Sequence, residues 1–355
     1  PRRRSVTART VGPPAVVQAL AAAAPFDAVT GQALALRDEL DRAGITSAIT
    51  AEHIDPSLAG EVMPLDTLDP EAPVLLRYSI WSAAAEAALA GSRPLGLVFH
   101  NITPAGLLAR ANPAVAALCE RGRAELPRVV ARSHVMIADS EFNARELRAA
   151  GGTDVRVVPL ILELPRCGPT APTGSDDVLY VGRLAPSKRI EDCIGAAVLL
   201  HRHRPGTRLH IVGSGDAFPR YEAALRHHAR VNGAADYVHF HGRVDDATRD
   251  ALYAQAGAYM SMSEHEGFCV PILEAMARGV PVVARDAGAV RETAGGGALL
   301  VQGRDTALAA AALEVAISQA RVRKGLAANA TARLAQLDRS VVGPQLVSAV
   351  QELLA

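Results

Sequence analysis

Short apolar segments rich in valine, leucine and isoleucine alternate with longer segments of helical periodicity along most of the chain. In the first half, the apolar segments cover residues 16–20, 45–51, 74–78, 95–99, 135–138 and 155–158. Leu34, Leu36 and Leu40 give residues 31–43 a helical period that Gly44 ends, and Ser140 is placed to cap a helix over 143–150. Strand–helix–strand order of this kind predicts a parallel, doubly wound sheet.

The same alternation restarts after residues 165–177, whose prolines, glycines and aspartates are typical of a linker. Beyond it, the predicted strands are 178–181, 208–212, 238–240, 257–262 and 280–284, and the predicted helices are 191–202, 220–232, 247–256, 271–278 and 341–354. This pattern predicts a second doubly wound sheet. Two such domains leave a cleft between the carboxyl ends of their sheets, where ligands usually bind.

Composition narrows the class of protein. A chain of 355 residues exceeds the usual size of one hydrophobic core, which favours two domains. The 37 basic and 37 acidic side chains cancel, whereas nucleic-acid binders usually carry a basic excess. No apolar run reaches the roughly 18 residues of a membrane span. The four cysteines form no C-x-x-C pair, so neither a zinc site nor a disulfide framework is expected, and a reducing cytoplasm fits: Cys119, Cys167, Cys193 and Cys269.

The first four residues, PRRR, are basic and precede serine, threonine and arginine rather than an apolar segment. This pattern is not that of a signal peptide. It is typical of a disordered tail, or of a weak contact with anionic lipid at the inner face of a membrane.

Residues 263–283, SEHEGFCVPILEAMARGVPVV, carry the most informative pattern. A strand ends before them, Pro271 is placed at the start of a helix, and Gly279 is placed just past its end. The free amides of that helix N-terminus are a ready site for phosphate. Glu266 falls in the loop before the helix and Glu274 one turn inside it, so two carboxylates can flank one bound ligand.

A second motif, VGRLAPSK over residues 181–188, also follows a predicted strand. Arg183 and Lys188 lie five residues apart across a turn, and two such cations can grip a diphosphate. Two further segments sit at strand ends. The glycines of IVGSGD at 211–216 fit many strand-to-helix turns, and FHGRV at 240–244 precedes a predicted helix.

Together these motifs resemble the E-x7-E region and the G-R…K pair of retaining glycosyltransferases with the two-Rossmann GT-B fold, family 4 (glycosyl transferases group 1). The resemblance implies that Glu266 contacts the donor sugar, that Glu274 takes the ribose hydroxyls, and that Arg183 and Lys188 act on the leaving diphosphate. It places further donor contacts, largely through backbone groups, at Gly182, Gly213, Gly215, Arg243, Val244, Gly267, Phe268, Cys269 and Val270. The family often has glycine where this chain has Cys269.

In the first half, HNITP at residues 100–104 follows a strand, which would turn His100 towards the cleft. The resemblance places a histidine here near the reacting sugar, with Asn101 beside it on the acceptor side. Asp27 and Gly31 lie in the first strand–helix loop, where the family often has paired glycines. Tyr78, with Trp81 after it, either lines an acceptor pocket or only packs.

The expectation is therefore a GT-B glycosyltransferase. Its domains are predicted at 1–166 on the acceptor side and 167–338 on the donor side, with 339–355 as a helix returning to the first. It is expected to move a sugar from a UDP-, GDP- or ADP-sugar to a hydroxyl of a sugar, lipid-linked or small-molecule acceptor, with retention. The chain has no D-x-D triplet, so no metal and no cofactor are expected. A nucleotide-sugar epimerase and a non-catalytic nucleotide-binding partner protein stay open as alternatives.

Overall fold

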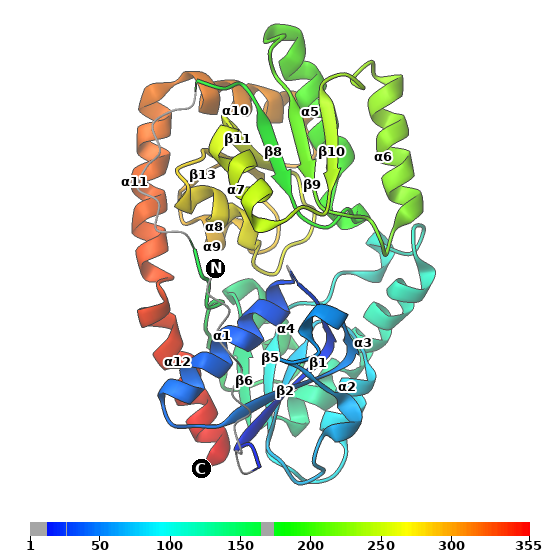
Figure 1. Cartoon of the computed structure of the whole chain (residues 1–355), viewed down its shortest axis with the longest axis vertical. Helices are drawn as coiled ribbons and strands as arrows, with labels where there is room; N and C mark the ends of the chain where they lie inside the picture. Colours follow the sequence, from blue (N-terminus) through cyan, green and yellow to red (C-terminus); the bar gives the residue numbers. More distant parts are fainter. Residues whose placement is uncertain (1–12, 26, 165–173) are drawn as a thin grey trace.

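The computed structural model describes residues 13–25, 27–164 and 174–355. Two α/β halves lie one above the other along the long axis (Figure 1). Each half is built on a parallel sheet, so the predicted pair of doubly wound sheets is confirmed. The first four residues, Cys167 and the predicted domain boundary at 166/167 lie outside the described residues.

The first sheet has the strand order β3-β2-β1-β4-β5-β6-β7. Its strands are β1 (Val16–Ala23), β2 (Ser47–Ile54), β3 (Met63–Pro64), β4 (Val74–Tyr78), β5 (Leu95–Phe99), β6 (Val135–Ala138) and β7 (Val155–Val157). Its helices are α1 (Ala28–Arg42), α2 (Ala83–Leu89), α3 (Pro113–Arg132) and α4 (Glu141–Ala149). Because every residue of β4 and β5 is buried, these strands are covered on both faces, as parallel strands usually are.

The second sheet has the order β10-β9-β8-β11-β12-β13. Its strands are β8 (Val178–Val181), β9 (Leu209–Val212), β10 (Val238–Gly242), β11 (Ala258–Ser261), β12 (Val282–Arg285) and β13 (Ala298–Val301). Its helices are α5 (Ile190–His203), α6 (Pro219–Val231), α7 (Asp246–Gln255), α8 (Val270–Ala277), α9 (Val290–Ala294) and α10 (Thr306–Ser318). The strand order reverses at β8, which pairs with β9 on one side and β11 on the other.

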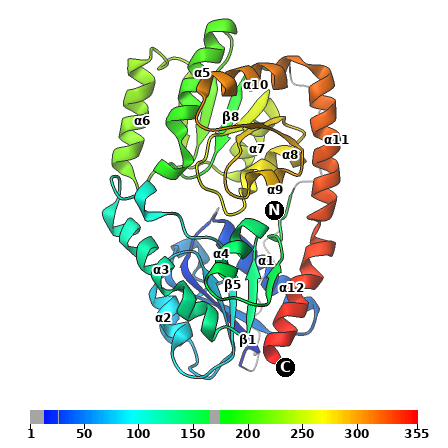
Figure 2. The ribbon, with the colours of Figure 1, turned by 180° about the vertical axis from the view of Figure 1, so that it is seen from behind.

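Two final helices, α11 (Ala320–Gln336) and α12 (Arg339–Leu354), run along one side of both halves (Figures 1 and 2). The apolar face of α12 joins the core of the first half, where Leu346 and Val350 pack with Leu36, Leu40 and Val98. Arg339 pairs with Glu39 of α1 at the start of this helix. The last helix therefore ties the end of the chain to its first domain.

The sequence analysis did not predict seven elements: α2, α3, α9, α10, α11, β3 and β13. Alanine dominates α10, TALAAAALEVAIS, so the apolar and polar faces of this helix differ little in the sequence. Of the helices in the described part of the chain, none combines the length and the apolar character that crossing a bilayer requires.

Candidate functional site

The two motifs of the second half lie side by side where its strand order reverses. Residues 182–188 follow β8 and residues 262–267 follow β11, and these strands are neighbours in the sheet. The amide of Glu264 donates to the carbonyl of Ser187 at 2.8 Å, which joins the two loops. Ligands of open α/β sheets bind at such a switch point.

Lys188 and Glu266 form an ion pair at the centre of this junction. Lys188 Nζ lies 2.8 Å from Glu266 Oε1, and their side chains are 20% and 8% exposed. Burial alone would raise the pKa of Glu266, but the Lys188 ammonium and hydrogen bonds from Lys188, Ser263 and Cys269 outweigh it and hold the pKa below its ordinary value. Glu266 is therefore a buried carboxylate that stays ionised because a cation faces it.

The backbone of this loop is fixed from the neighbouring β12–α9 connection. The amide of Ala289 donates to the carbonyl of Glu266 at 2.9 Å. Thr293 Oγ1 donates to the carbonyl of Phe268 inside the protein. Ala289 and Thr293 were not predicted from the sequence, since neither lies in a motif.

Cys269 adopts the left-handed backbone conformation, with φ 73° and ψ 66°, directly before α8. Glycine takes this conformation freely. This explains why the family that the motifs resemble often has glycine at the position of Cys269. The Cys269 thiol is buried, and burial together with the nearby Glu266 carboxylate raises its pKa well above the ordinary value. Val270 occupies the first position of α8, and no side chain in the described part of the chain caps the helix N-terminus. The helix end thus presents backbone amides, as predicted.

Glu274 lies one turn into α8, half-buried, as the sequence predicted. Its Oε2 accepts a hydrogen bond from the hydroxyl of Tyr253 at 3.0 Å. Burial and the Glu274 carboxylate raise the pKa of Tyr253 well above its usual range, so this hydroxyl remains a donor. Tyr253, from α7, was missed because a buried helical tyrosine looks like core in a sequence.

The remaining predicted donor-side residues differ in their contacts and in their exposure. Gly213 has a φ of 133°, and a Cβ there would overlap the carbonyl of Gly182, so the two loops touch through their glycines. The amide of Gly215 donates to Glu222 at 2.9 Å. The exposed Arg243 is turned to Asp216, at 2.5 Å, and Val244 beside it is half-buried. Arg183 is exposed, and among the described residues none pairs with it.

In the first half, the ring of His100 is turned into the protein. Its side chain is 3% exposed, Nδ1 lies 2.7 Å from Asp139 Oδ2, and Nε2 lies 3.3 Å from Arg77 Nη1. A guanidinium only donates, so Nε2 must accept and the hydrogen sits on Nδ1, donated to Asp139. The prediction that His100 faces the cleft is therefore wrong for its ring, because both ring nitrogens are engaged within the first domain.

Arg77 belongs to a polar row that crosses the first sheet. It is 2% exposed and donates to Gln18 Oε1 at 2.6 Å and to Gln32 Oε1 at 2.6 Å. Burial lowers the pKa of Arg77 to about 9, while the charge of Asp139 opposes this shift. The sequence signal was a single arginine in the apolar strand VLLRY, and the prediction singled out Tyr78 of that strand but not Arg77.

Asn101 connects the two halves at the loop that carries Glu266. With a φ of 74°, it donates from Nδ2 to Asn143 Oδ1 at 2.8 Å, and its Oδ1 contacts His265 Nε2. Burial lowers the pKa of His265 to about 4, so this ring is neutral at pH 7. A Cβ on Gly267 would come within 2.7 Å of Asn101 Cβ, so the close approach requires glycine.

A second pair of contacts across the halves involves the start of α4. Ser140 Oγ donates to the carbonyl of Gly267 at 2.7 Å. The amide of Glu141 donates to both carboxylate oxygens of Glu292, at 2.8 and 2.9 Å. A carboxylate at a helix N-terminus is favourable. Asn101 and Ser140, the residues that follow His100 and Asp139, therefore bring the first domain to residues 263–267 of the second.

Three other predicted residues have structural roles. Asp27 caps α1 by accepting from the Thr30 amide at 2.9 Å, and Gly31 lies exposed in the first turns of that helix. Tyr78 is fully buried and donates its hydroxyl to the carbonyl of Gly122 at 2.8 Å. The placement of Tyr78 on the acceptor side is therefore wrong. Of the two predicted roles, lining an acceptor pocket or packing, the structure supports packing. Trp81 is also buried, under Arg121.

Comparison with known proteins adds independent evidence. Residues 175–318 match the family described as glycosyl transferases group 1. A phosphatidyl-myo-inositol mannosyltransferase of Mycolicibacterium smegmatis is 34% identical over 193 residues, which cover 53% of this chain and 46% of that protein. A glycogen synthase of Mycobacterium tuberculosis is 36% identical over 141 residues, 40% of this chain and 32% of that protein. The matched part thus spans less than half the length of these relatives.

Solved structures resemble nearly the whole chain. Anabaena HepE in complex with UDP and glucose has a TM-score of 0.71 at 19% identity, covering 95% of this chain and 99% of that one. WaaG, a glycosyltransferase involved in lipopolysaccharide biosynthesis, has a TM-score of 0.72 at 16% identity, covering 94% and 98%. At such identities the likeness concerns the fold, and it confirms the predicted GT-B arrangement of two Rossmann-like domains.

Proposed function

Because residues 175–318 match the glycosyl transferases group 1 family and the chain has the GT-B fold, we propose that it transfers a sugar from a nucleotide-sugar donor to a hydroxyl of its acceptor, with retention of configuration. The donor binds at the carboxyl edge of the second sheet. The acceptor, a sugar, a lipid-linked or a small molecule, enters from the side of the first domain.

One observation carries this proposal: the Lys188–Glu266 pair lies beside the N-terminus of α8, which no side chain of the described residues caps. The helix amides suit a diphosphate. Glu274, one turn further, suits the ribose hydroxyls, because its Oε2 is held by Tyr253 and its other oxygen remains to accept. With the sugar at Glu266, the diphosphate at the helix amides and the ribose at Glu274, the three groups would lie in the order of the donor molecule.

Bond cleavage places negative charge on the departing diphosphate. Lys188 lies next to this position, and Arg183 is exposed at the same strand end, so both cations suit the developing charge. Glu266 remains ionised and accepts hydroxyl donors of the sugar. The second-domain half of the site therefore supplies binding and charge stabilisation.

Retention is supported by the way His100 is held. Inversion needs a general base that deprotonates the acceptor opposite the leaving group. In His100, Nδ1 donates to Asp139 and Nε2 accepts from Arg77, so the ring has no free lone pair for a proton. The acceptor proton would pass to the diphosphate on the same face, and His100 positions the donor sugar through its backbone.

Binding of free nucleotides tests the donor class. UDP, GDP and ADP, and then their sugars, are screened by thermal shift, since a ligand at 100 times its Kd stabilises a protein by about 2.7 kcal/mol. HepE was solved with UDP-glucose, and a GDP-mannose-dependent mannosyltransferase is 35% identical over 122 residues, so UDP and GDP are tested first. A panel without any stabilising nucleotide contradicts the proposal. If the protein binds a nucleotide but neither transfers the sugar nor hydrolyses the donor slowly, the non-catalytic alternative is favoured. Conversion of the donor to an isomer favours the epimerase.

We further propose that transfer needs no metal ion, because the chain has no D-x-D triplet and places Arg183 and Lys188 at the diphosphate position. Activity should survive EDTA. Activity that EDTA abolishes and Mn²⁺ restores is the contrary result.

A further inference from the structure

Arg189 follows Lys188 in an unusual backbone conformation. Among the described residues, the non-glycine residues with left-handed φ are Asn101, Arg189 and Cys269, and all three contact the 263–269 segment or belong to it. Arg189 has φ 51° and ψ 47° and immediately precedes α5. Strained backbone of this kind gathers at functional sites, where surrounding contacts hold it in place.

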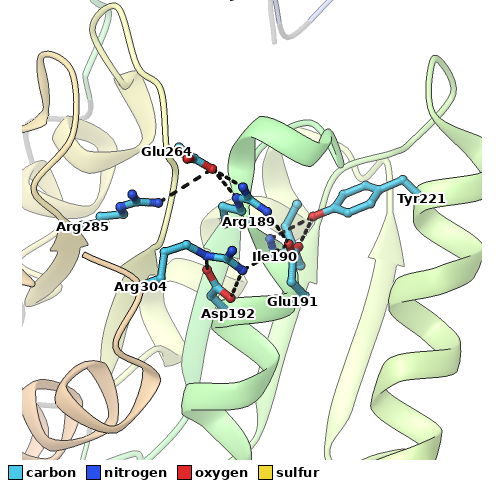
Figure 3. Close-up of polar contacts among 8 residues, drawn as sticks. All are labelled: Arg189, Ile190, Glu191, Asp192, Tyr221, Glu264, Arg285 and Arg304. Carbon is cyan, nitrogen blue, oxygen red and sulfur yellow. Dashed lines mark hydrogen bonds and ion pairs between the residues drawn. The ribbon is translucent and has the colours of Figure 1, made fainter. Parts of the chain in front are cut away.

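Those contacts centre on Glu264. The guanidinium of Arg189 pairs with the Glu264 carboxylate, and its Nη1 also lies 3.3 Å from Glu191 Oε1 (Figure 3). Arg285, at the end of β12, approaches Glu264 from the other side at 4.0 Å (Figure 3). Glu264 thus receives cations from two elements while its own amide is bonded to Ser187.

The start of α5 is itself anchored. The hydroxyl of Tyr221 accepts from the Ile190 amide at 3.1 Å and donates to Glu191 (Figure 3). Arg304 binds both oxygens of Asp192 at 2.9 Å (Figure 3). Arg189 therefore extends from a fixed helix start to the loop that carries Glu264 and Glu266.

Three links then join the two motif loops in order: the Ser187–Glu264 backbone bond, the Lys188–Glu266 pair and the Arg189–Glu264 pair. Lys188 is flanked in sequence by the two residues that hold Glu264, and Glu264 is two residues before Glu266. We propose that Arg189 and Glu264 are positioning residues, whose ion pair sets the distance between Lys188 and Glu266. This rests on the proposed transfer at the Lys188–Glu266 site.

The side chains of Arg189 and Glu264 are 23% and 27% exposed, so their pair adds little stability by itself. Its role is geometric: displacing a catalytic group by about 1 Å can cost about 100-fold in rate. The expected signature is a loss of turnover with little change in affinity for donor or free nucleotide.

The activity test compares two variants at one position. Arg189→Gly removes the guanidinium and suits the left-handed backbone, whereas Arg189→Ala removes it and keeps the strain. Both should lower kcat by about 10- to 100-fold and change the donor KM by less than about threefold. Glu264→Gln should do the same. Normal activity in Arg189→Gly would reduce Arg189 to a backbone role and overturn the proposal.

Arg304→Gln is the matched control. It breaks ion pairs with Asp192 and, at 3.9 Å, with Glu191 in the same cluster, but among the described residues no hydrogen bond or ion pair joins Arg304 to either motif loop, so kcat should stay within about threefold of the natural chain. An equal loss in Arg304→Gln would mean that the cluster acts only through general stability.

A second readout needs no turnover. Lys188 and Lys324 are the only lysines in the chain, so lysine labelled with ¹⁵N at Nζ gives two side-chain ammonium signals. The paired Lys188 ammonium should exchange slowly with water, and the exposed Lys324 serves as the internal reference. Faster exchange at Lys188 alone in Arg189→Gly and Glu264→Gln supports the proposal, and unchanged exchange contradicts it. An inactive natural chain that binds no nucleotide refutes the proposed transfer instead, whatever the lysine signals show.

Discussion

The two halves of the candidate site are built in different ways. In the second domain, Lys188 and Glu266 each lie in a loop with a recognisable motif, and the fold brings them together over 78 positions of sequence. In the first domain, the polar row from Gln18 through Arg77 to His100 and Asp139 consists of single residues at or near strand ends. Under the proposed function, the second half supplies charge and binding, while the first half supplies a fixed shape around the reacting sugar.

Removing the cation of the second half should have the largest effect. Lys188→Met is expected to lower kcat by about 10²–10³-fold, because a charge that stabilises the leaving group is lost, and to weaken donor binding less. Steady-state kinetics separate the two terms. If only donor affinity falls and kcat is unchanged, Lys188 contributes to donor binding and not to stabilisation of the leaving group.

The same variant has a pH signature in stability. In the natural chain the pKa of Glu266 is lowered, so its contribution is present above the unfolded-state value of about 4.3 and is lost as pH falls through the folded-state pKa. Without Lys188, burial should raise this pKa, and stability should fall as pH rises. We expect a loss of about 3–5 kcal/mol at pH 7 in denaturant titrations, recovered largely by adding Glu266→Gln, without recovery of activity.

His100 offers the matching test in the first half. If the ring only fixes the local shape, His100→Ala should lose about 10- to 100-fold in kcat and keep the product configuration. Proton NMR of the product from a donor of known anomer gives the outcome. Complete inactivity together with an inverted product from the natural chain would assign His100 the role of a general base and remove the contrast between the two halves.

Nucleotide affinity should respond at Glu274. Glu274→Gln is expected to weaken binding of the free nucleoside diphosphate by about 10- to 150-fold, the equivalent of about 1.5–3 kcal/mol for a charged hydrogen bond. Tyr253→Phe keeps the carboxylate but removes the hydroxyl that holds it, and should weaken binding by only about 2- to 10-fold. Calorimetric titration measures both. Equal affinities of the natural chain and the two variants would show that Glu274 does not bind the ribose.

The sequence predicted the two sheets because β-strands such as 74–78 and 95–99 are continuous apolar runs with the right spacing. It predicted the placement of Glu266, Glu274 and Lys188 because short motifs fix strand end, loop and helix start locally. It did not predict the orientation of the His100 ring, since Arg77 and Asp139 reach it from other strands, 23 and 39 residues away. Pairing across strands is a property of the sheet, and no local pattern encodes it.

The smallest effect separates backbone strain from side-chain chemistry at Cys269. Its left-handed conformation costs a residue with a Cβ about 1–2 kcal/mol, while its buried thiol adds packing. Cys269→Ala loses the thiol and keeps the strain, whereas Cys269→Gly loses both. We therefore expect the glycine variant to be the more stable of the two by about 1 kcal/mol, with nucleotide affinity unchanged within about threefold, because the diphosphate position uses backbone amides.

The control for this comparison is Cys193, which is also buried but lies inside α5. In a helix interior, glycine is less favourable than alanine by about 1 kcal/mol, so the order of the two variants should reverse there. Chemical denaturation of the four variants gives both differences in one experiment. If the alanine variant is more stable than the glycine variant at both positions, the backbone of Cys269 is not strained in solution. A loss of nucleotide affinity in Cys269→Gly would show that the thiol itself, through its contact with Glu266, takes part in binding the donor.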